Sequence, residues 1–318
     1  MNVIGIIKQK PQFEKICDLK SEGFFTFPRE DNTGSMYVIS STGEIFQFNE
    51  STSEHVLTLN ANSCCGLCFD NNGLIYVSDL NNSSIFFKQM SAMEQNPLIE
   101  SILAKDFDGT SLKGPNALTY NRNDNVLYFA DSGNFDSGSI TPRDTTIYAV
   151  DLETRVLRKL ISNISFVNDI CYDSNRECLY LAETFMNRII RLKQNDNGIF
   201  ISNVFYQFTG RIGPTALTLD ENGNLFVARF EYSSADMDMD IEADGIISVL
   251  NKEGILLGEL TLPELPEIMG LYISPKKREN LYFTERNSTG VFLVKLSSFI
   301  NDIDKYEEVL NVEYKENN

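Results

Sequence analysis

The chain has 318 residues, of which 42% are hydrophobic and 23% are charged, and its formal net charge is −18 at pH 7. Binding to a nucleic-acid backbone needs clustered Lys and Arg, so this acidic balance excludes a nucleic-acid partner. No run approaches the roughly 18 apolar residues of a membrane span, and residues 1–8 lack the apolar core of a signal peptide. The composition predicts a cytoplasmic protein with no membrane partner.

The first predicted element is a strand at 12–19, and a series of repeated units follows it. Six short apolar strands centred on an aromatic residue recur at 36–39, 75–79, 127–131, 179–183, 225–229 and 281–285. Their aromatic positions (37, 76, 128, 180, 226 and 282) are separated by 39, 52, 52, 46 and 56 residues. A strand repeat of this length is typical of a β-propeller.

Each repeat also contains an earlier strand, a turn rich in Asn, Asp and Gly, and one or two later strands. In the second repeat these are 66–70, 71–73 and 84–88. Four antiparallel strands joined by hairpin turns make one propeller blade. The sequence contains no Trp, which argues against the WD40 class.

The sequence therefore predicts an all-β fold, a single six-bladed β-propeller of four-stranded antiparallel blades. The predicted blades are roughly 20–62, 63–113, 114–163, 164–210, 211–264 and 265–300. The 12–19 strand is expected to pair with the last blade and close the ring, which removes an exposed sheet edge. The segment 306–314 is an alternative for that closing strand, and no stretch of 12 or more residues shows a helical stripe.

One residue of each repeat lies just before a small residue or Asp at the start of the first strand. These six ring residues are Glu22, Cys65, Asn116, Asn168, Thr215 and Met269. If the first strands are innermost, the ring residues surround one end of a central channel, which we call the channel mouth. One carboxylate and two carboxamides form a set of oxygen donors suited to Ca²⁺ or Mg²⁺ rather than to zinc.

The second strand of each repeat runs back toward the same end, so its last residue is expected at the channel mouth as well. These strand-end residues are Asp79, Asp131, Glu183, Arg229 and Glu285. Clustered acids there would raise one another's pKa values or recruit a cation. The alternative is that the Asn residues cap turns and the acids are merely solvated.

Three further features have alternative explanations. Cys65 and Cys68 have the spacing of a zinc or redox motif, but no second such pair and only one His accompany them, so small buried hydrophobes explain them better. The segment 236–244 spaces acids as a calcium loop does but lacks the Gly and Glu of an EF-hand. The insert 132–144 is either a flap over the channel mouth or a plain surface loop.

The order of several motifs resembles the SMP-30/gluconolactonase and strictosidine synthase-like superfamily. The motifs are Val167-Asn168-Asp169, Ala182-Glu183-Thr184 and Asn187-Arg188, with Ser21-Glu22-Gly23 in the first repeat. The resemblance covers roughly residues 13–296 and implies a six-bladed propeller that holds a divalent cation, usually Ca²⁺, and hydrolyses lactones or organophosphates.

The resemblance implies that Glu22, Asn116 and Asn168 are metal ligands. The family usually has Asp where this chain has Thr215, and a hydroxyl supplies neither the charge nor the pKa of that Asp. A weak or absent cation site follows unless Glu183, Asp169 or Glu285 compensates, and Glu183 and Asp169 are the candidate catalytic residues. Two functions follow as hypotheses: a metal-dependent hydrolase of small esters or lactones, and a non-catalytic propeller that binds a protein partner.

Overall fold

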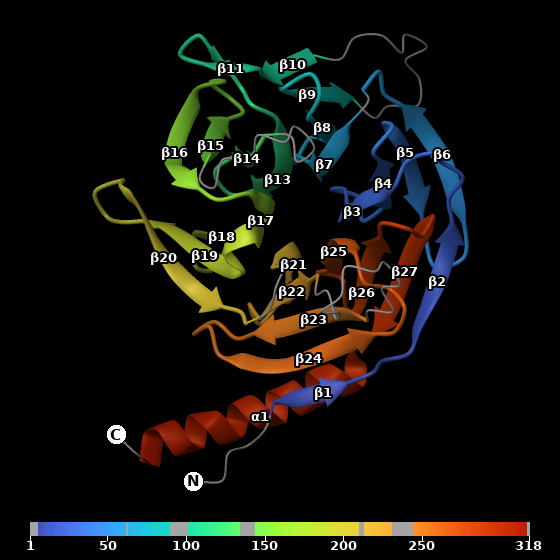
Figure 1. Cartoon of the computed structure of the whole chain (residues 1–318), viewed down its shortest axis with the longest axis vertical. Coiled ribbons are helices and arrows are strands. Elements are labelled where there is room, and N and C mark those ends of the chain that lie inside the picture. Colours follow the sequence, from blue (N-terminus) through green and yellow to red (C-terminus); the bar gives the residue numbers. More distant parts are fainter. Residues whose placement is uncertain are drawn as a thin grey trace, which may run out of the picture.

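In the computed structural model, six four-stranded antiparallel sheets are arranged around a common centre (Figure 1). The structure describes residues 6–61, 63–89, 101–133, 144–209, 213–230 and 244–316, with side chains of the C-terminal helix described to residue 308. The predicted six-bladed β-propeller is confirmed.

The six sheets are numbered as blades in chain order, and the strands of each blade run from the centre outward. Blade 1 contains β3 (Phe25–Glu30), β4 (Met36–Ser40), β5 (Glu44–Phe48) and β6 (Ser53–Thr58). Blade 2 contains β7 (Cys64–Phe69), β8 (Leu74–Asp79), β9 (Ser84–Gln89) and β10 (Ser101–Ala104). Blade 3 contains β13 (Pro115–Asn121), β14 (Val126–Asp131), β15 (Thr145–Asp151) and β16 (Leu157–Ile164), and a small hairpin of β11 (Asp106–Phe107) and β12 (Thr110–Ser111) precedes it.

The second half of the chain repeats this arrangement. Blade 4 contains β17 (Val167–Asp173), β18 (Cys178–Glu183), β19 (Arg188–Gln194) and β20 (Phe200–Gln207), with the 3-10 turn η2 (Thr184–Met186) between β18 and β19. Blade 5 contains β21 (Pro214–Leu219), β22 (Leu225–Arg229), β23 (Gly245–Leu250) and β24 (Leu256–Leu262). Blade 6 contains β25 (Ile268–Ser274), β26 (Lys277–Glu285), β27 (Gly290–Lys295) and the N-terminal β2 (Phe13–Asp18).

The aromatic strands form the core because the faces of each sheet pack against neighbouring blades. Every residue of β14 and β18 is buried. Central aromatics contact aromatic residues of the next inner strand across the seams: the rings of Tyr37 and Phe69 are 5.1 Å apart and those of Tyr128 and Tyr172 are 5.4 Å apart. Such pairs add to the hydrophobic burial of each seam, so the repeat that marks the strands in the sequence also holds adjacent blades together.

The ring is closed by the N-terminal strand, as the sequence predicts. β2 pairs antiparallel with β27, with Phe13 opposite Val294 and Asp18 opposite Gly290. The Phe13 ring contacts those of Phe283 and Phe292 edge-on, with both pairs of centroids 6.1 Å apart. Because β2 and β27 lie at opposite ends of the chain, their pairing joins the first and last parts of the propeller.

The alternative closing strand at 306–314 is not formed, and the expectation that no segment shows a helical stripe is wrong. Residues 306–314 do not form a strand but belong to a 20-residue helix, α1 (Ser297–Glu316). Phe299, Ile300 and Ile303 of α1 are buried in the core cluster of blades 5 and 6, so packing on the sheet stabilises this helix. Within the described part of the chain, no helix has the length and apolar character of a membrane span.

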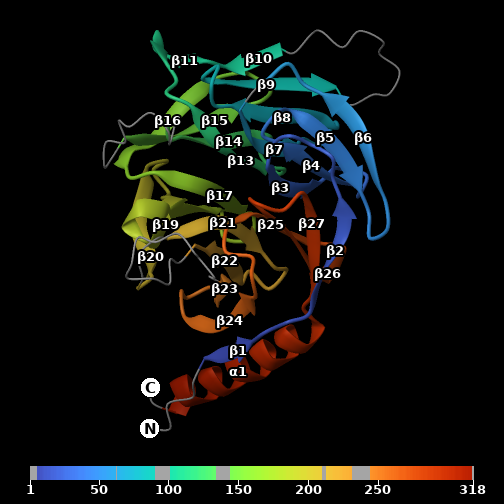
Figure 2. The ribbon, with the colours of Figure 1, turned by 45° about the vertical axis from the view of Figure 1, so that its right-hand side comes forward.

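A fifth strand on blade 5 also escapes the sequence prediction. β1 (Ile7–Gln9) pairs in parallel with the outer strand β24, and the side chain of Gln9 donates a hydrogen bond to Asp302 of α1 at 3.0 Å. Figures 1 and 2 show β1 and α1 lying side by side beneath blade 5. Three residues are too few for a periodic signal, which explains why the strand is not predicted.

Candidate functional site

Five of the six ring residues lie at matching places in their blades. In each case the pairing of the two innermost strands breaks at the ring residue, as where Pro115 faces Asp131 and Ala117 faces Ala130 while Asn116 between them is unpaired. The same break occurs at Cys65, Asn168, Thr215 and Met269. A bulge of this kind re-aims the side chain of the extra residue. The inner strands therefore bring Asn116 and Asn168 to equivalent positions in neighbouring blades.

Blade 1 departs from this pattern, and Glu22 is not in its inner strand. Phe25 faces Ser40 as the first pair of the two inner strands, and Thr26 faces Ile39, so the break in pairing falls later than in the other blades, at residues 27–28. By its place directly after the first pair, Thr26 corresponds to Asn116. Glu22 precedes β3, is exposed, and lines an open hollow of about 570 Å³ whose other residues all come from blade 1 or the loop before it. Among the lining residues of that hollow are Lys20 and Glu44. The structure thus places Thr26 at the sixth ring position and Glu22 outside it.

Asn116 has a buried oxygen with no partner. Its Nδ2 donates a hydrogen bond at 2.8 Å to the backbone oxygen of Val167 in blade 4, which fixes the orientation of the amide. Its Oδ1 is buried, and no described residue donates to it; the same holds for Oγ1 of Thr26. Buried polar atoms are nearly always hydrogen-bonded, so orphaned ones at one end of a channel point to a ligand, an ion or water.

Thr215 uses its hydroxyl to join blades 5 and 6. Its Oγ1 donates to the backbone oxygen of Ile268 at 2.8 Å, and Ala228 offers a second acceptor at 3.3 Å. Asn116 makes the equivalent bond to Val167, and Thr184, in the turn after β18, donates from blade 4 to the oxygen of Pro214, both at 2.8 Å. Thr215 is therefore part of a series of bonds between successive blades.

Asp169, a predicted catalytic candidate, lies inside the protein. Its side chain is 0% exposed; Oδ1 accepts from the N–H of Ile170 at 2.8 Å and Oδ2 from the N–H of Leu217 at 2.7 Å. Burial raises the pKa of this carboxyl to about 7, and the charge of Arg29 and the two N–H donors oppose that rise. Both oxygens already accept bonds from the backbone, so the arrangement suits a structural joint rather than a base.

Glu183, the other catalytic candidate, is also fully engaged. It is 1% exposed, accepts the N–H of Ser165 at 2.8 Å, and forms an ion pair with Arg188 of the adjacent strand. The geometry anchors the loop that enters blade 4. No free oxygen of Glu183 faces a substrate space among the described residues.

The remaining strand-end residues are likewise used within their own blades. Asp131 accepts the N–H groups of Lys113 and Gly114, Asp79 is bonded by Asn82, Glu285 accepts the N–H of Asn287, and Arg229 pairs with Glu259. Burial raises the pKa values of Asp131 and Glu285. The direction agrees with the prediction, but its main cause is burial rather than repulsion between acids.

A calcium ion does not fit the described residues of the channel mouth. Within the described ranges no group of three or more His, Cys, Asp or Glu could hold a metal. Two amide oxygens, Asn116 and Asn168, remain, beside hydroxyls such as Thr215 that bond the backbone. Divalent affinity follows the charge of the ligand set, and this set is neutral. The predicted calcium-like segment and flap lie largely outside the described residues, at 231–243 and 134–143.

The six cysteines are free thiols, and two of them form the Cys65 and Cys68 pair of the sequence analysis. Burial raises the pKa of Cys65 and of Cys68 to about 12, so neither is a thiolate near neutral pH. Metal binding and disulfide exchange both require the thiolate. The structure therefore favours the description of Cys68 as a small buried hydrophobe, whereas Cys65 is partly exposed at its ring position.

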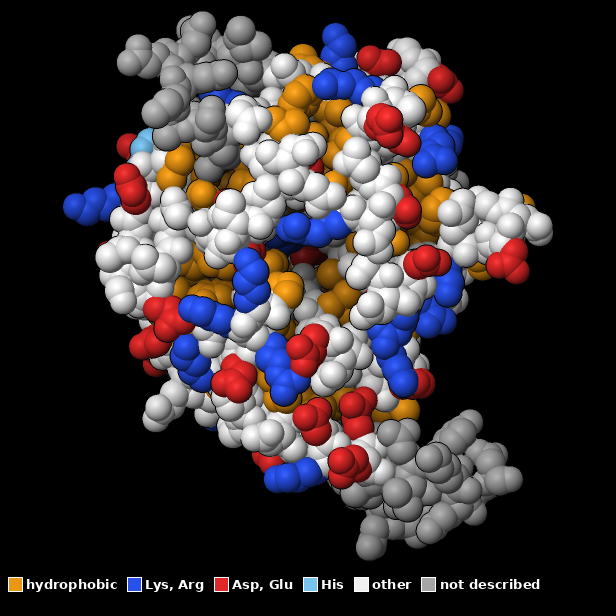
Figure 3. All heavy atoms as spheres, turned by 180° about the vertical axis from the view of Figure 1, so that it is seen from behind, with side chains coloured by type: hydrophobic (Ala, Val, Ile, Leu, Met, Phe, Trp, Pro, Cys, Tyr) orange, Lys and Arg blue, Asp and Glu red, His pale blue; other side chains and the backbone are white. Residues whose placement is uncertain are grey.

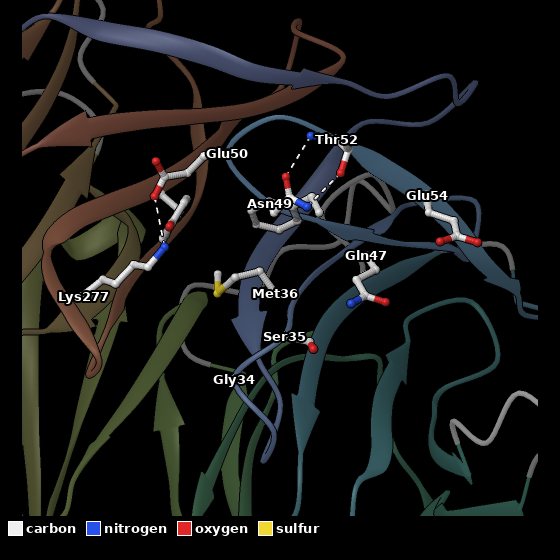
Figure 4. Close-up of a pocket in the computed structure, with 11 residues that line it drawn as sticks. Gly34, Ser35, Met36, Gln47, Asn49, Glu50, Thr52, Glu54 and Lys277 are labelled. Carbon is white, nitrogen blue, oxygen red and sulfur yellow. Dashed lines mark hydrogen bonds and ion pairs between the residues drawn. The ribbon is translucent and has the colours of Figure 1, made fainter.

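One polar hollow lies away from the channel, between blades 1 and 6. It has a volume of about 320 Å³ and includes Glu50, which pairs with Lys277 at 3.2 Å. Figure 4 shows these two side chains pointing toward each other across the seam, with Asn49 bonded to Thr52 beside them. None of its lining residues is a ring residue, so it is a seam between blades and not part of the channel.

The opposite end of the channel contains a cavity lined by all six inner strands. Its volume is about 170 Å³, and each inner strand contributes one residue three positions after its ring position: Arg29, Cys68, Thr119, Cys171, Thr218 and Tyr272. Three residues of a strand span roughly 10 Å, which is the distance along the axis from the channel mouth. We call this space the axial cavity. Sequence reasoning missed it.

A signal for the correct alignment of blade 1 is present in the sequence. The ring residues of blades 2 to 6 precede the central aromatic of the next strand by 11, 12, 12, 11 and 13 residues, as at Cys65 and Tyr76. Thr26 precedes Tyr37 by 11 residues, whereas Glu22 precedes it by 15. That spacing identifies Thr26, and through it Arg29.

Comparison with known families agrees with the propeller. Residues 22–287 match the family described as "SMP-30/Gluconolactonase/LRE-like region". Lactonase drp35 of Staphylococcus epidermidis is 31% identical over 121 residues, which are 37% of this chain and 34% of that protein. The counterpart in Staphylococcus aureus is 30% identical over the same length. The match thus spans about a third of the length of these curated relatives.

Solved structures share the fold at low sequence identity. A gluconolactonase from Xanthomonas campestris has a TM-score of 0.70 and 15% identity, over 90% of this chain and 89% of that one. A luciferin-regenerating enzyme gives 0.71 and 16%, over 90% and 95%. A calcium-binding protein, regucalcin, from Agrobacterium tumefaciens gives 0.69 and 14%, over 91% and 95%. At these identities the likeness shows a common fold.

Proposed function

The chain belongs to the SMP-30/gluconolactonase/LRE-like family, and on that premise we propose that it hydrolyses small esters or lactones at the channel mouth. The observation that carries the proposal is the buried, unpartnered Oδ1 of Asn116. A buried oxygen without a hydrogen-bond donor lowers the stability of the protein. If the channel mouth bound no ligand, a residue without that oxygen would make the protein more stable. The names of the lactonase relatives support the same class of substrate.

Asn116 and Asn168 are the groups that would bind the substrate. The amide of Asn116 is held by its bond to Val167, so its Oδ1 presents a fixed acceptor to a substrate hydroxyl. Asn168 is partly buried in the next blade, and no described residue bonds its side-chain amide. Two fixed amides in neighbouring blades can orient a small ring ester, and orientation is a large part of catalysis.

The proposal includes no bound cation, because calcium does not fit the described residues of the channel mouth. The regucalcin neighbour is named as calcium-binding, but the described ring residues of this chain form a neutral donor set. Glu22 would have to leave its place before β3 to join them. We therefore assign the cation no step in the reaction.

A lactone and aryl-ester panel tests the proposal, assayed with CaCl₂, MgCl₂, MnCl₂ or EDTA. We expect turnover of at least one lactone, and Asn116→Ala should lower kcat/KM by about tenfold or more, the loss typical of a hydrogen bond made to a reacting substrate. Asn197→Ala, in the exposed turn after β19, is the matched control and should change nothing. Inactivity with every ion and substrate would contradict hydrolysis.

A second candidate, a non-catalytic propeller that binds a protein, is favoured by the outer strand of blade 4. β20 is an edge strand on which Ile201 and Val204 are 56% and 46% exposed. Unpaired strand edges with apolar side chains are common protein-binding surfaces. The test is whether a partner that co-purifies with the wild-type protein fails to bind the Ile201→Lys variant. If it does, and the protein is inactive on the whole panel, this function replaces the first.

A further inference from the structure

The axial cavity contains two arginines at the end of the channel opposite the ring. Arg29 of β3 is partly buried, and Arg122, which follows β13, is exposed at the opening. Figure 3 shows the face opposite to that of Figure 1, with a hollow at its centre crossed by Lys and Arg side chains. Because Arg122 lines the cavity and is exposed, the cavity opens to solvent at this end of the channel.

Arg29 is fixed in place but retains free donors. Its Nη1 donates to the backbone oxygens of Pro28 at 3.0 Å and Leu271 at 3.2 Å, and its guanidinium lies 5.0 Å from the centre of the Phe27 ring. Among the described residues none accepts from its Nε or Nη2. A guanidinium held on one side with donors free on the other is suited to an oxyanion.

The other polar groups of the cavity also offer hydrogens. Thr119 accepts the N–H of Tyr172, and Thr218 accepts the N–H of Ile273, both at 3.2 Å. Each hydroxyl hydrogen is left without an acceptor among the described residues. The thiols of Cys68 and Cys171 are neutral, because burial raises both pKa values. The cavity therefore presents mainly donors together with apolar surface.

The charges that line the cavity sum to one positive charge. Arg29 and Arg122 are opposed by Glu30, which is bonded to Ser274 and lies 3.4 Å from Lys276. Asp169 faces Arg29 from blade 4, and Asp70 lies near Cys68, but each already accepts backbone N–H groups and does not line the cavity. The lining residues by themselves therefore carry one net positive charge, which matches a monoanion better than a phosphate dianion.

We propose that the axial cavity binds a small organic monocarboxylate, with Arg29 and Arg122 on the carboxylate and Thr119 and Thr218 donating to polar atoms beside it. The cavity volume of about 170 Å³ is larger than a small inorganic anion fills, since one water molecule occupies about 30 Å³ in the liquid. The apolar residues Phe69, Ile170 and Leu217 line the remainder. This inference does not rest on hydrolysis, although lactone hydrolysis would yield a hydroxycarboxylate of this class.

Isothermal titration calorimetry with sodium lactate tests the proposal, at an ionic strength held constant with NaCl. We expect saturable binding of lactate and none of lactamide, which has the same shape without the charge. Arg122→Gln and Arg29→Lys should each weaken binding by about tenfold or more, the usual loss for a hydrogen bond to a charged group. Thermal melting of each variant confirms that it is folded.

Two control variants make the result specific. Arg158→Gln removes an exposed arginine from the outer strand of blade 3 and should leave lactate binding unchanged, as should Asn116→Ala at the channel mouth. Absence of saturable lactate binding, equal binding of lactamide or phosphate, or equal weakening by Arg158→Gln would overturn the proposal. Loss of ester turnover in Asn116→Ala with intact lactate binding would separate this site from the proposed hydrolytic one.

Discussion

Asp169 of blade 4 accepts the backbone N–H of Leu217 in blade 5 at 2.7 Å, so a buried carboxylate joins two neighbouring inner strands. The same carboxylate accepts the N–H of Ile170 through its other oxygen. Residues next to the ring thus serve to hold the blades in place. The candidate site therefore lies among the residues whose hydrogen bonds join neighbouring blades.

Asp169→Asn is expected to lower the free energy of unfolding by about 1–3 kcal/mol, the penalty for an unmade buried hydrogen bond. The amide has one oxygen, so its NH₂ would face one of the two N–H donors. Urea unfolding measures the change. Asp196→Asn, at an exposed turn, should change stability by less than about 0.5 kcal/mol, and equal effects of the two would contradict the joint.

The same carboxyl makes stability depend on pH. Its pKa is about 7 in the folded protein and about 3.9 in an unfolded chain, so between these values the folded state holds the proton more tightly. The free energy of unfolding contributed by Asp169 therefore falls as the pH rises from 4 to 7, by at most about 1.4 kcal/mol per unit, and is constant above that. Unfolding curves at pH 5, 6, 7 and 8 should show this fall in wild type and a flatter profile in Asp169→Asn. A difference between the two proteins that does not vary with pH would contradict the raised pKa.

Glu183 and Arg188 are expected to act as one structural unit. Glu183→Gln and Arg188→Gln should each reduce stability by about 1.5–3 kcal/mol, the range for hydrogen bonds to charged groups, and the double variant by much less than the sum. A double-mutant cycle from urea unfolding measures the coupling. If Glu183→Gln instead lowers ester turnover and leaves stability unchanged, Glu183 is a catalytic residue after all.

The propeller could be predicted from the sequence because its signal is repeated six times. Each aromatic strand is the buried second strand of a blade, and the other repeats support its assignment. An error at one strand therefore does not change the predicted fold. The helix α1 occurs once, and its apolar residues Phe299, Ile303 and Tyr306 follow helical spacing within a segment that also contains apolar residues off that spacing. A helical pattern that occurs once is a weaker signal than a repeat, so the sequence does not predict α1.

The site could be predicted only in part because it depends on register. The sequence identifies Asn116 and Asn168 because a small residue or Asp follows each of them at the start of a strand. Glu22-Gly23 has the same local pattern, yet the strand of blade 1 begins only at Phe25. Which residue faces the axis is decided by the pairing of Phe25 with Ser40, a contact that local pattern does not contain.

Removal of the closing strand should open the ring. A chain that begins at Leu19 lacks β2, loses the Phe13 contacts with Phe283 and Phe292, and exposes the edge of β27. We expect its free energy of unfolding to fall by at least about 3 kcal/mol, because the partly buried Phe13 and the buried Cys17 are lost together with the strand pairing. A chain that begins at Pro11 lacks only β1 and should lose less. Equal thermal melting of the two would show that β2 does not close the propeller.

Thr215→Asp tests whether the ring can hold a cation. The new carboxylate cannot donate to the oxygen of Ile268, so without calcium the variant should melt at a lower temperature than wild type. With calcium present, the added charge beside Asn168 should raise affinity, because divalent binding follows ligand charge, and bound ligand raises the melting temperature by mass action. We expect the calcium-induced shift to exceed that of wild type by several degrees, roughly the effect of 1–2 kcal/mol in a protein of this size.

Thr215→Asn is the matched control, since it has nearly the same shape and loses the same hydroxyl without adding charge. Its NH₂ can still donate to the oxygen of Ile268, as Asn116 does to that of Val167, so without calcium it should melt later than Thr215→Asp, and it should respond to calcium no more strongly than wild type. Glu22→Gln in the Thr215→Asp background shows whether the exposed carboxylate before β3 also reaches the cation, in which case the calcium shift decreases. If Thr215→Asp and Thr215→Asn respond to calcium equally, the two amides do not form part of a cation site, and the unpartnered oxygen of Asn116 is left to bind substrate directly.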